Sequence, residues 1–399
     1  AGNFISLEER HIYARIWWDK EENKIGKKGK MSRIIYMTNL GTIPDQQGVI
    51  VKDNHGNKIG MIDEAFLEKL TKGDIFVLGG NTYQFGYARG MVAQVVPMPN
   101  KKPTVPSWYS DRLPLSYDLA KGICLFRSLM ESHFKKGESK KEILKFINEY
   151  LYVSDVAAEA LYNYFKDQQD YIGIPNDKKL IVECYRDEQM KNYVVFHALY
   201  GRRVNDALSR ALAFAIARSQ HKDVEIGISD NGFYVSYDRN VDVIKSFNLL
   251  KTKEFRKVLD LAVDKSEILK RRFRHCAGRS FMILRNYKGV QRRVGRQQVS
   301  STILLNAVRR ISENFFIIRE TRREILEDLM DYESALEVLT EIEEGRTKLI
   351  EVQTFIPSPF ALNLVMQGYS DILKLEDKQQ FLQRMHQMVK AKIALKNRR

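Results

Sequence analysis

One segment of the chain, residues 270–296, is strongly basic and could bind phosphate groups. Guanidinium groups donate two parallel N–H bonds to phosphate oxygens, and so many like charges need an anion or a buried acid nearby. Two explanations stay open: several of these side chains, with His275, contact nucleic acid, or they form ion pairs with acids such as the ten within residues 320–344. The basic segment contains no acid and ten cations: Lys270, Arg271, Arg272, Arg274, Arg279, Arg285, Lys288, Arg292, Arg293 and Arg296.

A second candidate site lies at residues 201–206, which read Gly-Arg-Arg-Val-Asn-Asp and open a predicted Ala-rich helix. The start of a helix exposes backbone N–H groups and the positive end of the helix dipole, so Arg202 and Arg203 there would favour a phosphate. Asn205 or Asp206 could equally serve only as the helix cap.

Aromatic and amide side chains add further candidates. Trp108 follows Pro103 and Pro106 in a stiff segment, and its ring could either stack on a base or fill the junction between two modules. Residues 294–301 (VGRQQVSS) include the donor Gln297 and precede an apolar helix, for which Ser300 or Ser301 is a suitable cap.

Trp17 and Trp18 are neighbours in a predicted strand. Alternation along a strand would place one ring in the core and the other outside it. We favour a structural role for the pair, as barrel core and as an interface with a neighbouring domain.

The overall composition agrees with a polyanionic partner. The chain has 65 Lys and Arg against 50 Asp and Glu, which gives a formal charge of +15. Its three cysteines lie far apart and form no CxxC pair, so we expect a reducing, cytoplasmic setting and no zinc site. We expect no membrane span or signal peptide, and the start at Ala1-Gly2 indicates a piece of a longer protein.

The sequence shows no recognisable catalytic centre. Gly29-Lys30 is followed by Met31 and lacks the first glycine of a P-loop, so we expect no ATP binding by this chain. The seven His residues are scattered, and no metal or cofactor is expected. His197 lies in an apolar strand and is interpreted as a core residue. Asp206 is the one acid that we nominate, weakly, as a catalytic group.

Local patterns predict an α+β fold with an N-terminal small antiparallel β-barrel, a central helical module, and a mixed α/β and helical C-terminal part. Short strands with Gly and Asn turns predict the barrel at residues 21–100 after a lead strand in residues 1–20. Residues 101–112 form a linker and residues 113–175 the helical module. An α+β module follows at 176–355, and a C-terminal helix at 356–399.

Two hairpins and one helix are predicted with particular clarity inside the α+β module. The first hairpin turns at residues 187–189, and the second turns at Asp230-Asn231-Gly232, a strong turn signal. Residues 203–219 (RVNDALSRALAFAIARS) carry apolar residues at three- and four-residue spacing, which predicts a helix.

Several strings resemble the region that follows the two RecA domains in Lhr-type (large helicase-related) helicases of superfamily 2, especially the archaeal ones. The resemblance runs in order over most of the chain, and its strings are NLGTIPD (39–45), PTVPSW (103–108), FHALYGRRVNDALSRALA (196–213), RFRHCAGRSFMILRNYKG (272–289), VGRQQVSS (294–301) and PSPFA (357–361). It implies that residues 176–355 form a DEAD/H-associated module, and that residues 1–20 end a winged-helix region or begin the next domain.

The resemblance also implies a function. The parent would be an ATP-dependent 3′→5′ helicase of DNA repair or RNA–DNA processing that uses ATP and Mg²⁺, and this chain would grip the tracking single strand behind the RecA motor. Single-stranded DNA, RNA or an RNA–DNA hybrid, and the RecA and winged-helix domains, are the expected partners. Two alternatives remain: a glycosylase-like base-repair domain, or a module that binds a partner protein.

Overall fold

The protein is described here by a computed structural model, in which two compact units are built from alternating parts of the chain. Unit 1 comprises residues 1–109 and 265–325, and unit 2 comprises residues 110–264 and 326–399. The structure describes residues 16–29, 32–41, 48–67, 70, 72–89, 92–99, 113–187, 190–238, 241–264, 266–284, 286–287, 290–291, 294–366 and 378–397.

The N-terminal part of unit 1 contains a five-stranded sheet in the order β4-β3-β7-β6-β5. Its inward side chains, among them Val51, Phe76 and Val95, are almost fully buried together with Phe66 of the short helix α3. The elements are β3 (Val49–Lys52), β4 (Lys58–Ile62), α3 (Glu64–Leu67), β5 (Ile75–Leu78), β6 (Asn81–Arg89) and β7 (Val92–Pro97).

One strand pairing of this sheet differs from the antiparallel barrel that the sequence predicts. β3 and β7 run parallel, with Val51 opposite Ala93, whereas the other pairs are antiparallel. The pairings of the described strands leave β4 and β5 at the two ends of an open order. Alternation of apolar residues specifies which face of a strand is buried, but it does not specify the direction of its partner.

The rest of unit 1 is mainly helical. The hairpin of β1 (Ile16–Asp19) and β2 (Lys24–Lys27) precedes α2 (Ser32–Asn39). The later segment supplies α10 (Glu267–Arg279), the two-residue strands β12 (Asn286–Tyr287) and β13 (Val290–Gln291), α11 (Val294–Ile311), α12 (Phe316–Arg323) and the first residues of the π-helix η3 (Glu324–Leu329).

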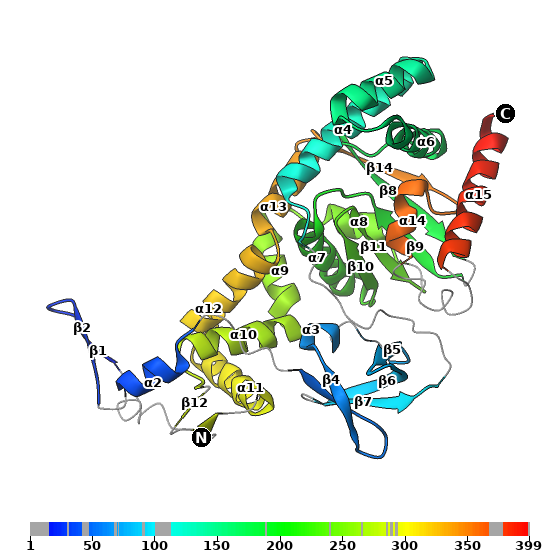
Figure 1. Cartoon of the computed structure of the whole chain (residues 1–399). Helices are drawn as coiled ribbons and strands as arrows, with labels where there is room; N and C mark the ends of the chain where they lie inside the picture. The colour runs from blue at the N-terminus through cyan, green and yellow to red at the C-terminus, as the bar shows by residue number, and fades with distance from the viewer. Residues whose placement is uncertain are drawn as a thin grey trace. The chain divides into compact units, whose positions relative to one another are not determined.

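Unit 2 is organised around a second five-stranded sheet in the order β10-β11-β9-β8-β14 (Figure 1). β8 and β9 form one antiparallel hairpin, β10 and β11 form another, and β14 pairs parallel with β8. Both hairpins predicted from the sequence are therefore confirmed. The strands are β8 (Lys179–Arg186), β9 (Asn192–Phe196), β10 (Glu225–Ser229), β11 (Gly232–Tyr237) and β14 (Lys348–Gln353).

Helices cover both faces of this sheet. On one face, Phe196 stacks on Phe233 at 4.5 Å between ring centroids and contacts Phe247 of α8. On the other face, Tyr193 and its neighbours pack against α14 and against Val389 of α15. Helix α7 (Arg202–Gln220) confirms the predicted Ala-rich helix. The other helices of this part of unit 2 are α8 (Val243–Asn248), α9 (Phe255–Asp264), α13 (Tyr332–Glu343), α14 (Pro359–Val365) and α15 (Lys378–Asn397).

The predicted helical module consists of α4 (Tyr117–Lys135), α5 (Lys140–Leu151) and α6 (Asp155–Tyr171). Ser154 caps α6, as its position in the sequence predicts, by accepting a hydrogen bond from the N–H of Ala157. The coarse expectation of a mixed α+β protein is confirmed. The domain boundaries stay predictions, since the two units divide the chain at residues 109, 264 and 325.

Candidate nucleic-acid interface

Helix α10 carries the first half of the basic segment on an amphipathic framework. Ser266 caps it by accepting from the N–H of Leu269. Leu269, Phe273 and Ala277 are at most 1% exposed, and their spacing of four residues turns one face of the helix into the core. The arginines between them must therefore lie on the flanks and the opposite face.

Two of these arginines share one buried carboxylate. Arg272 Nε lies 3.1 Å from Glu324 Oε2, and the guanidinium group of Arg279 pairs with the other oxygen of Glu324. Arg279 also donates to the Sγ of Cys276 at 3.2 Å. Because Glu324 is 4% exposed, it depends on these cations for compensation. Arg272 and Arg279 therefore take part in the kind of ion pair that one of the two explanations expects, and their contact with nucleic acid stays a prediction.

His275 of α10 lies close to four arginines of the same helix. Burial, as the largest cause, and the charges of Arg274, Arg272, Arg271 and Arg279 together lower the pKa of His275 to about 3. His275 is therefore neutral at pH 7 and contributes no cation of its own. The charges of these arginines thus act on His275 although Arg272 and Arg279 are paired with Glu324.

The hairpin that follows α10 is fixed to α2 through an asparagine. Asn39 is 1% exposed, and its amide donates to the carbonyl of Asn286 at 2.9 Å. Asn39 Oδ1 accepts from the N–H of Asn286 at 2.8 Å, and the Asn286 side chain donates to the Thr38 carbonyl at 2.7 Å. The two hydrogen bonds between Asn39 and the backbone of Asn286 resemble those between paired strands. They give a structural role to the asparagine that begins the NLGTIPD string.

An aromatic contact supports the same junction. Phe281, just beyond the end of α10, has a φ of 57°, a left-handed conformation that is uncommon for residues with a Cβ. Its ring packs edge-on against Tyr36 of α2 at 5.9 Å between centroids. The unfavourable backbone conformation of Phe281 thus occurs where its ring contacts α2, the helix that anchors the hairpin.

The start of α7 is already occupied by an acid of the chain itself. Asp230 Oδ1 accepts from the N–H groups of Arg202 at 2.9 Å and Leu115 at 3.1 Å. Gly201 has a φ of 85°, and a Cβ there would lie 2.3 Å from the Leu115 carbonyl oxygen, so only glycine fits. This carboxylate takes the place that a phosphate was predicted to take at the helix N-terminus.

Other residues of the same string also have structural contacts. Arg203 Nη2 donates to the carbonyls of Glu327 at 2.7 Å and Met330 at 3.0 Å. Neither Asn205 nor Asp206 is the helix cap, which corrects the alternative considered above, because Gly201 occupies that position. Asn205 is fully buried and donates to the Ala198 and Ser229 carbonyls.

Asp206, the weak catalytic candidate, forms an ion pair with Arg210 one turn along α7. His197 is 5% exposed, and its Nε2 lies 2.8 Å from Glu183 Oε2. Glu183 also accepts hydrogen bonds from Thr354 and Ser358. His197 is thus bound within a buried polar network of the core, as its apolar strand indicates.

The second half of the basic segment leads into α11. This helix begins at Val294, so Ser300 and Ser301 lie inside it. The prediction that one of them caps the helix is therefore wrong. The donor-rich string therefore forms the first turns of the helix, and Gln297 is 6% exposed within it. Arg292, Arg293 and Trp108, and the side chain of Arg296, lie outside the described residues.

Trp17 and Trp18 depart from the predicted alternation. Both rings are exposed, by 46% and 60%, and the Trp17 ring lies across Gly26 of the paired strand. Neither ring belongs to a core within the described part of the chain. In a two-stranded hairpin, there is no second layer on which the inward face could pack.

The acidic residues of 320–344 are largely used within the protein. Glu337 pairs with Lys121, Glu327 with Arg256, and Arg346 contacts Glu341 and Glu344. The sequence indicated that acids of this run could form ion pairs with the basic segment, but it did not single out Glu324. Glu324 stands three residues from Thr321 and three from Glu327, and this spacing does not mark it as the buried acid.

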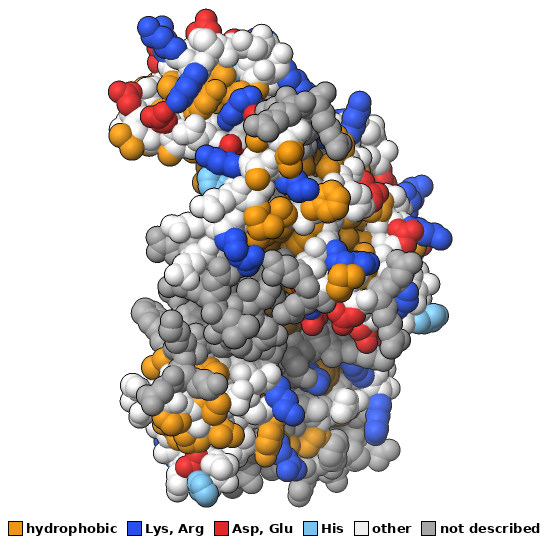
Figure 2. All heavy atoms as spheres, turned by 90° about the vertical axis from the view of Figure 1, so that its right-hand side faces the viewer, with side chains coloured by type: hydrophobic (Ala, Val, Ile, Leu, Met, Phe, Trp, Pro, Cys, Tyr) orange, Lys and Arg blue, Asp and Glu red, His pale blue; other side chains and the backbone are white. Residues whose placement is uncertain are grey.

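Basic side chains are distributed widely elsewhere. On the face drawn in Figure 2, Lys and Arg are spread among hydrophobic side chains without forming one continuous patch. No group of three or more His, Cys, Asp or Glu suited to a metal occurs in the described ranges. Among the helices that the structure describes, none has the length and apolar character needed to cross a bilayer.

Comparison with known proteins agrees with this architecture. Residues 4–105 match the winged-helix domain of the large helicase-related protein, and residues 174–361 match the family described as DEAD/H associated. The structure is similar to that of the Mycobacterium smegmatis helicase Lhr bound to ssDNA and AMP-PNP, with a TM-score of 0.64 and 21% identity over 88% of this chain and 40% of that one.

Relatives among curated proteins are closer in sequence. The ATP-dependent helicase Lhr-Core of Methanothermobacter thermautotrophicus is 49% identical, and that of Saccharolobus solfataricus is 40% identical. Each match covers 98% of this chain and 45% of the relative, so the chain spans slightly less than half the length of these proteins. The chain belongs to the Lhr, or large helicase-related, family and carries its winged-helix and DEAD/H-associated regions.

Proposed function

We propose that this chain is the single-strand-binding part of an Lhr-type, ATP-dependent 3′→5′ helicase. It holds the tracking strand behind the RecA motor of the parent protein through phosphate contacts of the basic segment. The RecA domains of the same polypeptide are its partners. ATP and Mg²⁺ belong to the motor rather than to this region.

The observation that carries the proposal is the composition of the basic segment, which contains ten Lys and Arg residues and no acid. Burial is the largest cause of the low pKa of His275, and the charges of four neighbouring arginines, which repel one another, add to it, although two of them share Glu324. A polyanion relieves such repulsion, and releasing the condensed counterions of a nucleic acid adds to the affinity. The bound ssDNA named for the mycobacterial relative supports DNA as the ligand.

A salt titration of the affinity for single strands tests the proposal. We expect log K to fall linearly with log salt, by about 0.7 for each phosphate neutralised. A triple variant, Arg292→Gln with Arg293→Gln and Arg296→Gln, should flatten this slope by up to about 2. Fluorescence anisotropy with DNA, RNA and hybrid oligonucleotides would measure it and rank the three ligands.

A control variant removes the same number of charges elsewhere. Lys140, Lys145 and Lys166 form exposed ion pairs on α5 and α6, so their replacement by Gln lowers the net charge equally without touching the basic segment. We expect the control to keep most of the salt slope. If both triple variants change the slope to the same extent, bulk charge and not the basic segment attracts the strand.

A further inference from the structure

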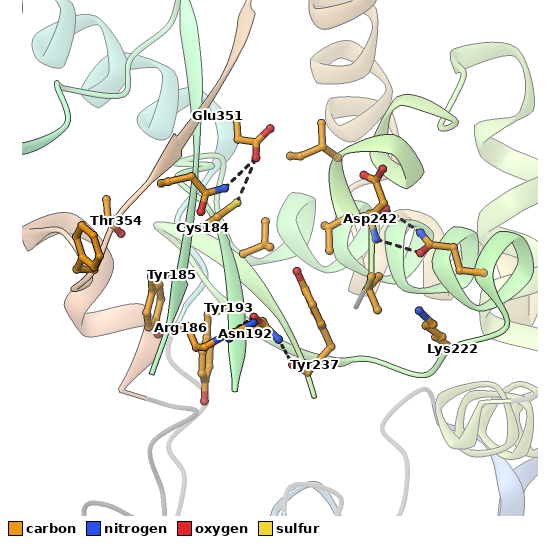
Figure 3. Close-up of a pocket in the computed structure, with 17 residues that line it drawn as sticks. Cys184, Tyr185, Arg186, Asn192, Tyr193, Lys222, Tyr237, Asp242, Glu351 and Thr354 are labelled. Carbon is orange, nitrogen blue, oxygen red and sulfur yellow. Dashed lines mark hydrogen bonds between the residues drawn. The ribbon is translucent and has the colours of Figure 1, made fainter. Parts of the chain in front are cut away.

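A pocket of about 910 Å³ opens on the sheet of unit 2, beside the part of the sheet that α8 covers (Figure 3). Strands β8, β9, β11 and β14 line it, together with the end of α7 and the residues that lead into α8. β8, β11 and β14 run in the same direction, and the pocket lies toward their C-terminal ends. Open sheets with parallel strands commonly bind ligands at this edge.

The strand register gives the pocket two chemically different ends. Arg186 and Tyr237 are both paired with Asn192, so the three residues lie side by side at one level of the sheet. Cys184, paired with Gln353, lies two residues back, or about 7 Å along the strand. Figure 3 accordingly shows Glu351 and Cys184 at one end of the pocket and Arg186, Asn192 and Lys222 toward the other.

The cationic end is built around Arg186. Its Nε donates to Asn192 Oδ1 at 3.0 Å, and the Asn192 amide donates to the Tyr237 carbonyl at 3.3 Å. This chain of bonds orients the guanidinium group. Its two terminal nitrogens form no hydrogen bond with any residue that the structure describes, and Lys222 adds a second positive charge to the lining. The fork is thus positioned to bind a phosphate.

Tyr237 places an aromatic ring between the two ends. The rings of Tyr185 and Tyr193 belong to the core on the opposite face of the sheet, so Tyr237 is the tyrosine whose ring enters the pocket, which Phe355 also lines. Burial, as the largest cause, raises the pKa of Tyr237 above its usual value, so the phenol keeps its proton at neutral pH. The ring offers a flat face for stacking, and its hydroxyl has no hydrogen-bond partner among the described residues.

The other end accepts hydrogen bonds. Glu351 Oε1 accepts from the Gln353 amide at 3.1 Å and faces the Cys184 thiol at 3.9 Å. Burial and the nearby Glu351 charge raise the pKa of Cys184 to about 12, so the thiol is not an activated nucleophile. This end therefore binds rather than reacts, and it favours ligand groups with N–H donors.

We propose that this pocket binds a single nucleotide, with its phosphate on Arg186, its base stacked on Tyr237 and an amino edge directed to Glu351. The shared chemistry fits either a free mononucleotide or one nucleotide of a bound strand. The strand case rests on the proposed function, whereas the mononucleotide case does not. The basic segment belongs to unit 1 and the pocket to unit 2, so the two sites can be tested separately.

Binding of a fluorescent mononucleotide tests the pocket directly. 2-Aminopurine monophosphate loses fluorescence when its base stacks, and we expect saturable quenching by the 399-residue protein. Arg186→Gln should weaken the affinity by about 10-fold, as expected for one charge-assisted hydrogen bond. Tyr237→Leu should remove the quenching. The control is Arg346→Gln, since Arg346 lies in the same unit and pairs with Glu341 and Glu344.

An oligonucleotide arm then identifies the source of the nucleotide. If Arg186→Gln weakens both mononucleotide and single-strand binding, the pocket holds a nucleotide of the strand; if only mononucleotide binding falls, the ligand is a free nucleotide. The proposal is overturned if Arg186→Gln alters neither, with the melting temperature unchanged. The salt slope of the Arg292, Arg293 and Arg296 variant is read separately and decides the proposed function alone.

Discussion

The side-chain amide of Asn39 and the backbone of Asn286 bond each other in both directions, across 247 positions of the sequence. The Asn39 side chain thus forms the hydrogen bonds that a further strand beside β12 would form. The hairpin within the basic segment is therefore anchored to α2 by a neutral side chain.

Replacing Asn39 should release this hairpin. Asn39→Ala leaves the N–H and carbonyl of Asn286 without their partner, so we expect a loss of about 1–3 kcal/mol in the free energy of unfolding. Hydrogen exchange should accelerate at Asn286–Gln291, which mass spectrometry of peptides can follow. Asn314→Ala, at an exposed asparagine, is the matched control. Unchanged protection of the hairpin would show that β12 and β13 need no anchor.

The shared carboxylate Glu324 predicts a second, distinct energetic effect. Replacing both Arg272 and Arg279 with Gln leaves a charge buried without compensation, and should destabilise the protein by about 3 kcal/mol or more. Adding Glu324→Gln should recover most of this loss. Urea unfolding measures both steps.

The exposed pair of Arg323 and Glu320 supplies the control for that experiment. Its side chains are 41% and 48% exposed, and Arg323→Gln should change stability by less than about 1 kcal/mol. A triple variant at Arg272, Arg279 and Glu324 that stays as unstable as the double variant would mean that packing of the arginine stems dominates.

His275 predicts a dependence of stability on pH. Its folded pKa, about 3, lies below the unfolded value near 6.5, so the unfolded state binds the proton more readily in between. Stability should therefore fall as the pH decreases from about 6.5 toward 3. His275→Gln should weaken this dependence, as seen in melting temperatures across a pH series, whereas His55→Gln at an exposed loop should not. Parallel curves for all three proteins would contradict a depressed pKa.

Trp108 can be tested although it lies outside the described residues. If its ring stacks on a base, Trp108→Ala should weaken single-strand binding by about 1–3 kcal/mol, nearly independently of the base. The salt slope should stay almost constant because no charge is lost. A lower melting temperature with unchanged affinity would instead assign Trp108 to the junction between modules.

Local signals predicted the elements of this protein better than its long-range contacts. The Asp230-Asn231-Gly232 turn and the apolar spacing of α7 act within a few residues, and both predictions are confirmed. The parallel pairing of β3 with β7 depends on a partner 42 residues away, and the apolar pattern carries no information about direction.

The candidate site shows the same division. The sequence identified the basic segment, but it did not reveal that Glu324 would compensate two of its arginines or that Asp230 would occupy the α7 N-terminus. Each of these acids is distant in the chain from the group it satisfies. A phosphate site and an internal carboxylate site need the same donors, so residue type alone does not distinguish them.

The discontinuity of unit 1 has a consequence for how the protein is made. Residues 1–109 leave the ribosome before residues 265–325 exist, and all of residues 110–264 are synthesised in between. During that interval the side chain of Asn39 has not yet formed its hydrogen bonds with Asn286, and α2 cannot yet pack against the hairpin. No contiguous truncation can isolate unit 1, so testing the two proposed binding sites separately requires point substitutions or a circular permutation that joins its two segments.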